Sequence, residues 1–407
     1  MGYLGSLASD SVSVLLDENI NKYHLKKLII NYNPDYIFID KNNNKNIKNY
    51  KFVFNFFDFD LIESQKKKSK NLHPNLKLLV STSGSTGTSK FVKLSSKNID
   101  CNTISISKYL KISTKDNAIT TLPMSYVYGL SIINTHLYNG ATVTLNRNSL
   151  VQKDFWTKLE KHKVTNFGGV PYIYSILDKI NLNRFDLKYL KYTTQAGGKL
   201  HETIVKRILE KYKPLNIKLL IMYGAAEATA RMSFLPWGKI KDKINSIGKP
   251  IAGGKFSIQD ENSKIINAKN KVGELIYKGK NVCMGYSNNF QDLSKEDVNK
   301  DILRTGDLAY VDKDKYYYLV GRKDRYIKIY GLRINLQELE DIIFDYGYEN
   351  MCLQEKENTI NIYLKKKLNL EKFSKYLSNL TNIHISVFKI NYIDEFPMNR
   401  NLKIIYK

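Results

Sequence analysis

Directly after a strand-like apolar segment, Leu76-Lys-Leu-Leu-Val80, stands the sequence Ser81-Thr-Ser-Gly-Ser-Thr-Gly-Thr-Ser-Lys90. A turn rich in glycine and hydroxyl residues after a strand can direct backbone N–H groups, hydroxyls and an ammonium at phosphate oxygens. It is not a Walker A loop, because no Gly-Lys-Ser/Thr triplet closes it at the required spacing. Taken alone, the pattern predicts either a phosphate-binding loop or a flexible Ser/Thr linker.

The segments around this loop alternate between strand-like and helix-like patterns. Residues 12–16 and 36–39 are short apolar runs with a helical stretch, residues 25–30, between them, whereas residues 41–50 and 64–75 have loop composition. Further strand-like segments are residues 141–145, 219–222, 273–277 and 316–320. The mixture predicts an α/β protein with a doubly wound core.

A domain boundary is expected where the Tyr-rich strand ends in Gly321-Arg-Lys-Asp324. Residues 1–323 then form a large N-terminal domain of mixed sheets packed with helices. Residues 324–407 form a small α+β domain at the C-terminus.

Composition limits the class of protein. The net charge is +25, yet only nine of the 64 cationic residues are arginine, and the lysines are scattered. Lys, Asn, Ile and Tyr all have A/T-rich codons, so codon bias explains the charge better than a nucleic-acid partner does. The densest lysine run, residues 66–70, lacks the interleaved aromatic residues of a base-stacking surface. No apolar run approaches the ~18 residues of a membrane span.

The three cysteines, Cys101, Cys283 and Cys352, are far apart and fit no metal or disulfide pattern. The simplest interpretation is a reducing cytoplasm.

Four further motifs follow the loop in order. They are Tyr223-Gly-Ala-Ala-Glu227, Arg304-Thr-Gly-Asp307, Gly321-Arg-Lys-Asp-Arg-Tyr-Ile-Lys328 and Phe396-Pro-Met-Asn-Arg-Asn-Leu-Lys403. With the loop, these blocks span residues 82–403, and the chain resembles the adenylate-forming superfamily. That family contains acyl- and aryl-CoA synthetases, peptide-synthetase adenylation domains and firefly luciferase.

The resemblance implies an ATP-dependent acid ligase. Formation of an acyl adenylate brings a carboxylate against the α-phosphate of ATP, so the repulsion between anions must be offset by a phosphate cradle, a cation and a divalent metal. Glu227 is implied as the Mg²⁺ carboxylate, and Asp307 as the acceptor of two ribose hydroxyls. The residues implied to hold the nucleotide are Thr82, Ser83, Gly84, Ser85, Thr86, Gly87, Ala196, Gly197, Gly198, Tyr223, Gly224, Asp307 and Arg322.

Four residues are implied to act on the reacting groups: Lys90, Glu227, Arg322 and Lys403. In the family, a lysine of the C-terminal domain touches the carboxylate, the α-phosphate and the ribose, and Lys403 matches it. The family's small domain also rotates between the two half-reactions. This implies a hinge at Asp324 and places Gly331 in the tunnel that admits the thiol. The alternative for Asp324 is a residue that merely caps a turn.

The positions of the nine arginines support these blocks independently. A composition that favours lysine should retain arginine where lysine cannot replace it, and an ammonium cannot pair two oxygens at once as the planar guanidinium does. Arg322 is the best candidate for a ribose or phosphate contact. Arg325 and Arg333 are either site residues or ion-pair residues of the small domain. The other arginines in or beside the blocks are Arg231, Arg304 and Arg400.

The block Leu122-Pro-Met-Ser-Tyr-Val-Tyr-Gly129 resembles the start of the family's acid pocket, with Tyr126 as an aromatic gate or a core residue. Gly129, Gly168 and Gly169 are expected in the pocket wall. No Asp stands between Thr121 and Thr135 to pair a substrate ammonium, which favours an uncharged acyl or aryl acid over an amino acid. The acceptor is the thiol of CoA or of a phosphopantetheine carrier protein.

Three positions depart from the family pattern. Ser89 replaces a proline, Ala226 a threonine and Leu402 a glycine. Residues 2–17 also resemble a segment that the family reaches only after a leading strand and helix, so we expect a start inside the fold, with a misplaced start codon as the explanation. These departures leave a degenerate, non-catalytic nucleotide-binding domain as one alternative function, and an amino-acid-activating adenylation domain is the other.

Overall fold

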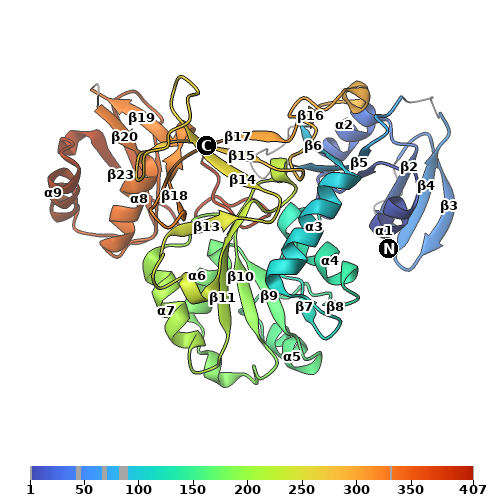
Figure 1. Cartoon of the computed structure of the whole chain (residues 1–407), viewed down its shortest axis with the longest axis horizontal. Helices are drawn as coiled ribbons and strands as arrows, with labels where there is room; N and C mark the ends of the chain where they lie inside the picture. The colour runs from blue at the N-terminus through green and yellow to red at the C-terminus, as the bar shows by residue number, and fades with distance from the viewer. Residues whose placement is uncertain (1, 43–46, 67–70, 82–89, 331, 407) are drawn as a thin grey trace.

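The computed structural model describes the chain except for residues 1, 43–46, 67–70, 82–89, 331 and 407. Its centre is an 11-stranded mixed sheet (Figure 1). In spatial order the strands are β14 (Lys255–Gln259), β15 (Gly273–Lys278), β17 (Ile302–Val311), β18 (Tyr317–Arg322), β13 (Ser246–Pro250), β12 (Ser233–Leu235), β11 (Lys218–Tyr223), β10 (Tyr192–Gln195), β9 (Asn166–Gly169), β7 (Asn117–Ile119) and β8 (Thr142–Thr144).

Strands β11, β10, β9, β7 and β8 run parallel, which requires crossover connections between them. Figure 1 shows α3 and α4 on one face of this part and α6 and α7 on the other. The helices are α3 (Ser96–Leu110), α4 (Val127–Tyr138), α5 (Lys153–Lys161), α6 (Pro171–Lys179) and α7 (Glu202–Tyr212). The predicted doubly wound α/β core is therefore confirmed.

Two smaller sheets are formed by the chain before this core, with β16 (Tyr286–Ser287) as a later strand that joins one of them. One pairs β1 (Ser13–Val14), β5 (Leu76–Ser81), β6 (Phe91–Ser95) and β16. The other is the antiparallel sheet of β2 (Tyr36–Asp40), β4 (Phe59–Ser64) and β3 (Tyr50–Phe56), beside α1 (Gly2–Ala8) and α2 (Lys22–Tyr32). Ser81 pairs with Phe91, so both ends of the predicted phosphate loop are held by the β5–β6 ladder.

The segment after β18 builds a second hydrophobic core. It comprises the hairpin β19 (Tyr326–Ile329) and β20 (Leu332–Asn335), the helices α8 (Leu336–Asp345) and α9 (Leu370–Thr381), and the sheet of β21 (Asn350–Leu353), β22 (Ile360–Leu364) and β23 (Phe388–Tyr392). This is an α+β unit, and its separate core supports two domains. The boundary between residues 323 and 324 stays a prediction.

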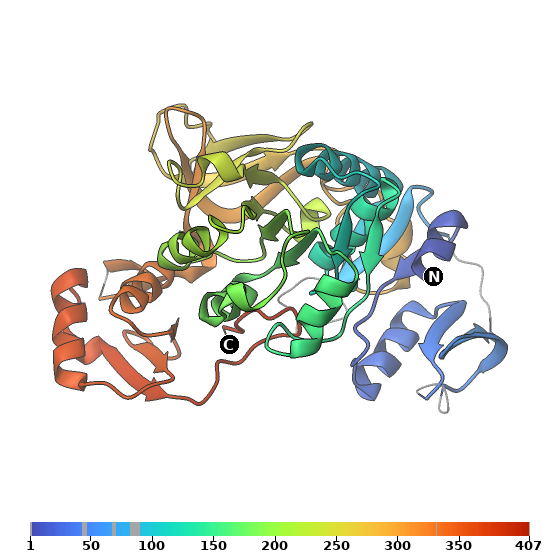
Figure 2. The same ribbon diagram turned by 90° about the horizontal axis from the view of Figure 1, so that it is seen from below.

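Beyond β23 the chain turns back and runs to the centre of the molecule, where it ends (Figure 2). The turn within residues 397–405 thereby reaches the face of the large core, whereas Tyr406 returns to the C-terminal unit, where its hydroxyl donates to Glu340 Oε2 at 3.3 Å. Among the described residues, no helix combines the length and apolarity of a membrane span.

Two core phenylalanines test the division into domains, since Phe373 lies in the C-terminal core and Phe155 in the large one, both with 0% exposure. Phe373→Ala removes enough packing to destabilise its core by ~3–5 kcal/mol. In calorimetry we expect it to lower one early transition and leave the main one in place, whereas Phe155→Ala lowers the main transition. One merged transition that shifts with either variant would contradict independent cores.

Candidate active site

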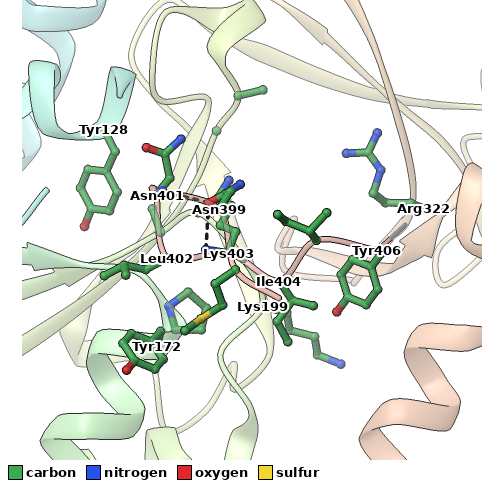
Figure 3. A pocket seen from close by; sticks show the side chains of 18 of the residues that line it. Tyr128, Tyr172, Lys199, Arg322, Asn399, Asn401, Leu402, Lys403, Ile404 and Tyr406 are labelled. Atoms are coloured by element: carbon green, nitrogen blue, oxygen red, sulfur yellow. Dashed lines mark hydrogen bonds between the residues drawn. The ribbon is translucent and has the colours of Figure 1, made fainter. Parts of the chain in front are cut away.

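A cavity of about 1860 Å³ lies between the large core and the C-terminal unit. It is lined from several separate parts of the chain, and Figure 3 shows residues 399–404 running through it between Tyr128 and Arg322. The predicted site residues that line it are Lys90, Tyr126, Ala196, Gly197, Gly198, Tyr223, Gly224, Glu227, Asp307, Arg322, Asp324 and Lys403. Thr82, Ser83, Gly84, Ser85, Thr86, Gly87 and Gly331 lie outside the described residues.

Asp307 and Arg322 form one corner of the cavity because they are register partners across β17 and β18. The Tyr223 hydroxyl donates to Asp307 Oδ2, and Arg322 Nε lies 3.8 Å from Asp307 Oδ1. Burial raises the pKa of Asp307, while the Tyr223 hydrogen bond and Arg322 oppose that rise. The carboxylate is thus oriented at the cavity wall, where it can accept hydrogen bonds from a diol.

Gly224 stands at the end of β11, where no side chain fits. A Cβ there would lie 1.8 Å from the carbonyl oxygen of Ala230. The backbone therefore folds back on itself and brings Glu227, in the 3₁₀ turn Ala226–Ala228, to the cavity.

Glu227 and Lys90 are connected through Tyr286. The Tyr286 hydroxyl donates to Glu227 Oε1 at 2.8 Å, and Lys90 Nζ lies 3.7 Å from the centroid of the Tyr286 ring. Burial raises the pKa of the Tyr286 hydroxyl, and the neighbouring Glu227 raises it further. A neutral phenol thus orients the carboxylate and offers a π face to the ammonium.

Lys403 reaches the cavity beside Tyr126 and Gly197. Its Nζ lies 5.3 Å from the centroid of the Tyr126 ring. Gly197 has φ +89, and a Cβ there would lie 2.8 Å from Tyr126 Oη and 3.3 Å from Lys403 Cε. Only a glycine leaves room for the lysine to pass the tyrosine.

Burial lowers the pKa of Lys403 to about 8, helped by repulsion from Arg322 and Arg231 and opposed by Glu227. The ammonium therefore stands in a region with an excess of positive charge. An anion that enters the cavity gains from that charge.

The turn that carries Lys403 is tightly bonded. Met398 and Ile404 form a β-bridge, and Asn399 Oδ1 accepts from the backbone N–H groups of Asn401 and Lys403 at 2.9 and 3.1 Å (Figure 3). Leu402, which replaces the family's glycine, has φ +58 and packs on the large core. The turn thus forms despite the substitution, with the left-handed strain set against the burial of an apolar side chain.

Three further contacts fix this turn and the predicted hinge. Arg400 Nη1 lies 2.6 Å from Asp17 Oδ1, which ties the tail to the N-terminal segment. Asp324 accepts from Arg322 Nε at 3.2 Å within the 3₁₀ turn Lys323–Arg325. Arg325 is an ion-pair residue, because its Nη2 lies 2.7 Å from Glu340 Oε1 inside the C-terminal unit.

The three glycines predicted for the acid pocket pack behind its wall. A Cβ at Gly129 would lie 2.3 Å from the Pro123 carbonyl oxygen, whereas one at Gly168 would meet Ile132 and Tyr128. At Gly169 it would meet Ile173 and Tyr174. Close packing around α4 and α6 is sufficient to require glycine at these three positions. A direct contact with the substrate therefore stays a prediction. Tyr126 is 6% exposed and lines the cavity.

Two site residues were missed by the sequence analysis. Tyr286 is one of 29 tyrosines, and no local pattern distinguishes it. Asp17 meets Arg400 across 383 positions of sequence, a separation that no local pattern bridges.

Comparison with known proteins identifies relatives of this arrangement. The family described as AMP-binding enzyme matches residues 1–287. A luciferin 4-monooxygenase of Photuris pensylvanica is 29% identical over 319 residues, which cover 75% of this chain and 57% of the relative. An oxalate–CoA ligase of Arabidopsis thaliana is 28% identical over 299 residues, covering 72% and 57%. The chain thus spans little more than half the length of these relatives.

Solved structures share the fold. O-succinylbenzoate coenzyme A synthetase of Bacillus subtilis, in complex with ATP and a magnesium ion, matches with TM-score 0.68 and 23% identity. The match covers 83% of this chain and 70% of that one. The unliganded form of the same enzyme matches with TM-score 0.71 and 19% identity over 94% of this chain and 83% of that one.

The surroundings of Lys403 predict an unusual titration. In the ligand-free protein, reductively methylated with ¹³C, we expect the Lys403 signal to titrate near pH 8, whereas exposed lysines titrate near ~10.4. Loss of the signal in Lys403→Arg assigns it. Lys188 is the matched comparison, because its partner Asp186 raises its pKa. A Lys403 signal that titrates with the bulk lysines would show that the ammonium is not buried.

Proposed function

The chain belongs to the AMP-binding enzyme family, and on that premise we propose that it activates a carboxylic acid with ATP and transfers the acyl group to a thiol. The observation that carries the proposal is the convergence of Lys403, Glu227 and Asp307 on one cavity from three separate segments. In this proposal Lys403 is a buried cation for the reacting anions, Glu227 a carboxylate for a metal, and Asp307 a carboxylate for a ribose diol.

In the first half-reaction a carboxylate oxygen attacks the α-phosphorus of ATP. The bond from that phosphorus to the β-phosphate oxygen breaks, and pyrophosphate leaves with the electron pair. Two anions meet in this step, so a cation that is strongest in the transition state accelerates it. Lys403 supplies that charge beside Tyr126. In this proposal residues 82–90, which include Lys90, hold the β- and γ-phosphates that leave as pyrophosphate.

The donor set fits Mg²⁺. Glu227 lines the cavity and one of its oxygens is already oriented by Tyr286. Mg²⁺ is commonly held by one or two protein carboxylates together with substrate phosphates and water. When bound, it neutralises charge on the phosphate oxygens. Glu227 is the residue of this chain that would hold it.

In the second half-reaction a thiol sulfur attacks the acyl carbon of the adenylate. The C–S bond forms, the bond to the AMP oxygen breaks, and the thiol proton is released. CoA and the phosphopantetheine of a carrier protein present the same thiol, and both remain within the proposal. The three cysteines are free, which agrees with a cytoplasmic reaction.

Lys403 occupies the cavity from the side of the small unit, so the thiol needs that unit to move. The contacts that hold it include Lys199–Asp341 at 2.6 Å, Lys179–Glu349 at 3.2 Å and His201–Asp345 at 3.5 Å. Ion pairs at such solvent-accessible positions contribute ~0–1 kcal/mol each. A rotation at Asp324 would break these ion pairs, would withdraw Leu402 and Phe344 from the large core, and would bring the Gly331 segment to the acyl group.

The acids in the relatives' names differ, with oxalate and 4-coumarate among them, so they do not select one acid for this chain. The alternative of a degenerate nucleotide-binding domain predicts nucleotide binding without pyrophosphate exchange. The formed Leu402 turn and the placement of Lys403 in the cavity favour the active enzyme.

Lys403 tests the first half-reaction. Lys403→Ala should lower ATP–pyrophosphate exchange by ~10²–10³-fold, the loss typical of one transition-state donor. Thioester formation from supplied acyl adenylate should change little. Glu227→Gln is the companion variant, and it should raise the Mg²⁺ concentration needed for exchange. Equal loss of both half-reactions in Lys403→Ala would contradict the role given to this lysine.

The hinge has its own test, because proline fixes φ near −65° and prevents the dihedral change that rotation needs. Asp324→Pro should leave pyrophosphate exchange largely intact and slow thioester formation by about tenfold or more, since such conformational steps often limit turnover. Asp324→Ala is the matched control and should retain both. A parallel loss in the two half-reactions would remove the hinge from the mechanism.

A further inference from the structure

A buried arginine of the cavity has neutral partners, the Tyr109 hydroxyl among them, and no acidic one. Arg231 is 3% exposed and lines the cavity four residues after Glu227. Its backbone is held firmly, since Asn102 Nδ2 and Asn281 Nδ2 both donate to its carbonyl oxygen, at 2.8 and 2.9 Å. Its own N–H donates to Asn102 Oδ1 at 3.2 Å. The chain thus fixes where this side chain starts.

The guanidinium has neutral surroundings. Its carbon lies 3.8 Å from the centroid of the Tyr128 ring, Nε lies 3.3 Å from Met222 Sδ, and Nη1 lies 3.4 Å from the Ala230 carbonyl oxygen. All aspartates and glutamates of the chain fall within the described residues, and none of them forms an ion pair with Arg231. The phenols are neutral too, since burial raises the pKa of Tyr128 to about 12.

Burial of a guanidinium without an acidic partner destabilises the ligand-free protein. A guanidinium keeps its proton at any physiological pH, so it cannot escape burial by becoming neutral. A desolvated cation–π contact stabilises the folded protein by ~2 kcal/mol, whereas the desolvation of one buried ion costs several kcal/mol. A buried charge of this kind needs an anion, and the cavity is the route by which one arrives.

The position of Arg231 relative to Lys403 indicates which anion. The contacts run from Lys403 to Tyr126, whose ring centroid lies 6.2 Å from that of Tyr128, and from Tyr128 to Arg231. The two cations therefore stand at opposite ends of a pair of tyrosine rings. With Lys403 at the reacting carboxylate, as proposed above, Arg231 is the cation available to the other end of the acid.

We propose that the acid activated by this chain is a short dicarboxylic acid whose distal carboxylate pairs with the Arg231 guanidinium. The planar fork binds two carboxylate oxygens at once, which an ammonium does not match. The contacts from Lys403 to Arg231 pass over just two tyrosine rings, whose centroids lie 6.2 Å apart, so the acid that joins the two cations is short. This inference rests on the proposed acid activation, and it replaces the uncharged acid expected from the sequence.

The test is pyrophosphate exchange with two series of acids of equal carbon number, dicarboxylates from three to six carbons and the corresponding monocarboxylates. We expect at least one dicarboxylate to exceed its monocarboxylate partner by ~100-fold in kcat/KM. In Arg231→Met that advantage should fall to less than tenfold, mainly through KM, while Arg231→Lys retains part of it. Arg207→Gln, at an exposed ion pair with Asp178, is the matched control and should behave as the wild type.

Thermal unfolding separates a ligand-binding arginine from a structural one. Replacement of a buried ion by an apolar residue of similar volume is often neutral or stabilising. Ligand-free Arg231→Met should therefore melt at or above the wild-type temperature, and it should lose the stabilisation that the best dicarboxylate gives the wild type. A large fall in the melting temperature of ligand-free Arg231→Met would assign Arg231 to the fold instead.

The two proposals fail differently. If neither series supports exchange in the wild type, the short dicarboxylate is overturned, and acid activation itself is wrong if aryl and long-chain acids also fail although Mg²⁺ and ATP bind. If monocarboxylates exchange as well as dicarboxylates, or if Arg231→Met slows both series equally, acid activation stands and the dicarboxylate is overturned.

Discussion

Under the proposed function, repulsion between two anions is the constraint on which the rest of this site depends. A carboxylate approaches a triphosphate only where fixed positive charge compensates for lost water, and charge in a buried cavity acts with little screening. The chain supplies that charge from distant segments: Lys90 beside β6, Arg322 at the end of β18 and Lys403 on the C-terminal tail. Burial is the main cause of the low pKa of Lys403, and repulsion from Arg322 and Arg231 lowers it further.

The delivery of Lys403 depends on the turn at residues 397–405. The Asn399 side chain closes this turn, Leu402 anchors it on the large core, and Arg400 ties it to Asp17. The C-terminal unit meanwhile rests on exposed ion pairs and has its own core. Leu402 and Phe344 add apolar packing on the large core to these ion pairs, so the proposed movement of Lys403 has to break both kinds of contact.

Neutral tyrosines order the charges of the cavity without adding to them. Tyr223 orients Asp307, Tyr286 orients Glu227 and lies beneath Lys90, and Tyr126 lies beside Lys403. Burial keeps each phenol protonated, so each acts as a hydrogen-bond donor or a π face. Tyrosine is one of the residues that A/T-rich codons favour, and in this cavity tyrosines orient the carboxylates of Asp307 and Glu227.

The sequence determined the doubly wound core and the strands β5 and β11, and its motifs marked Tyr223, Asp307 and Lys403, which line one cavity. These follow from apolar periodicity and from short motifs whose spacing local geometry preserves. Tertiary structure alone decided that Tyr286 reaches Glu227, that Gly129 faces the carbonyl of Pro123, and that Arg231 is buried against Tyr128 without a carboxylate. Those contacts join residues on different elements. The absence of an acidic partner for Arg231 can be recognised only when all of its spatial neighbours are known.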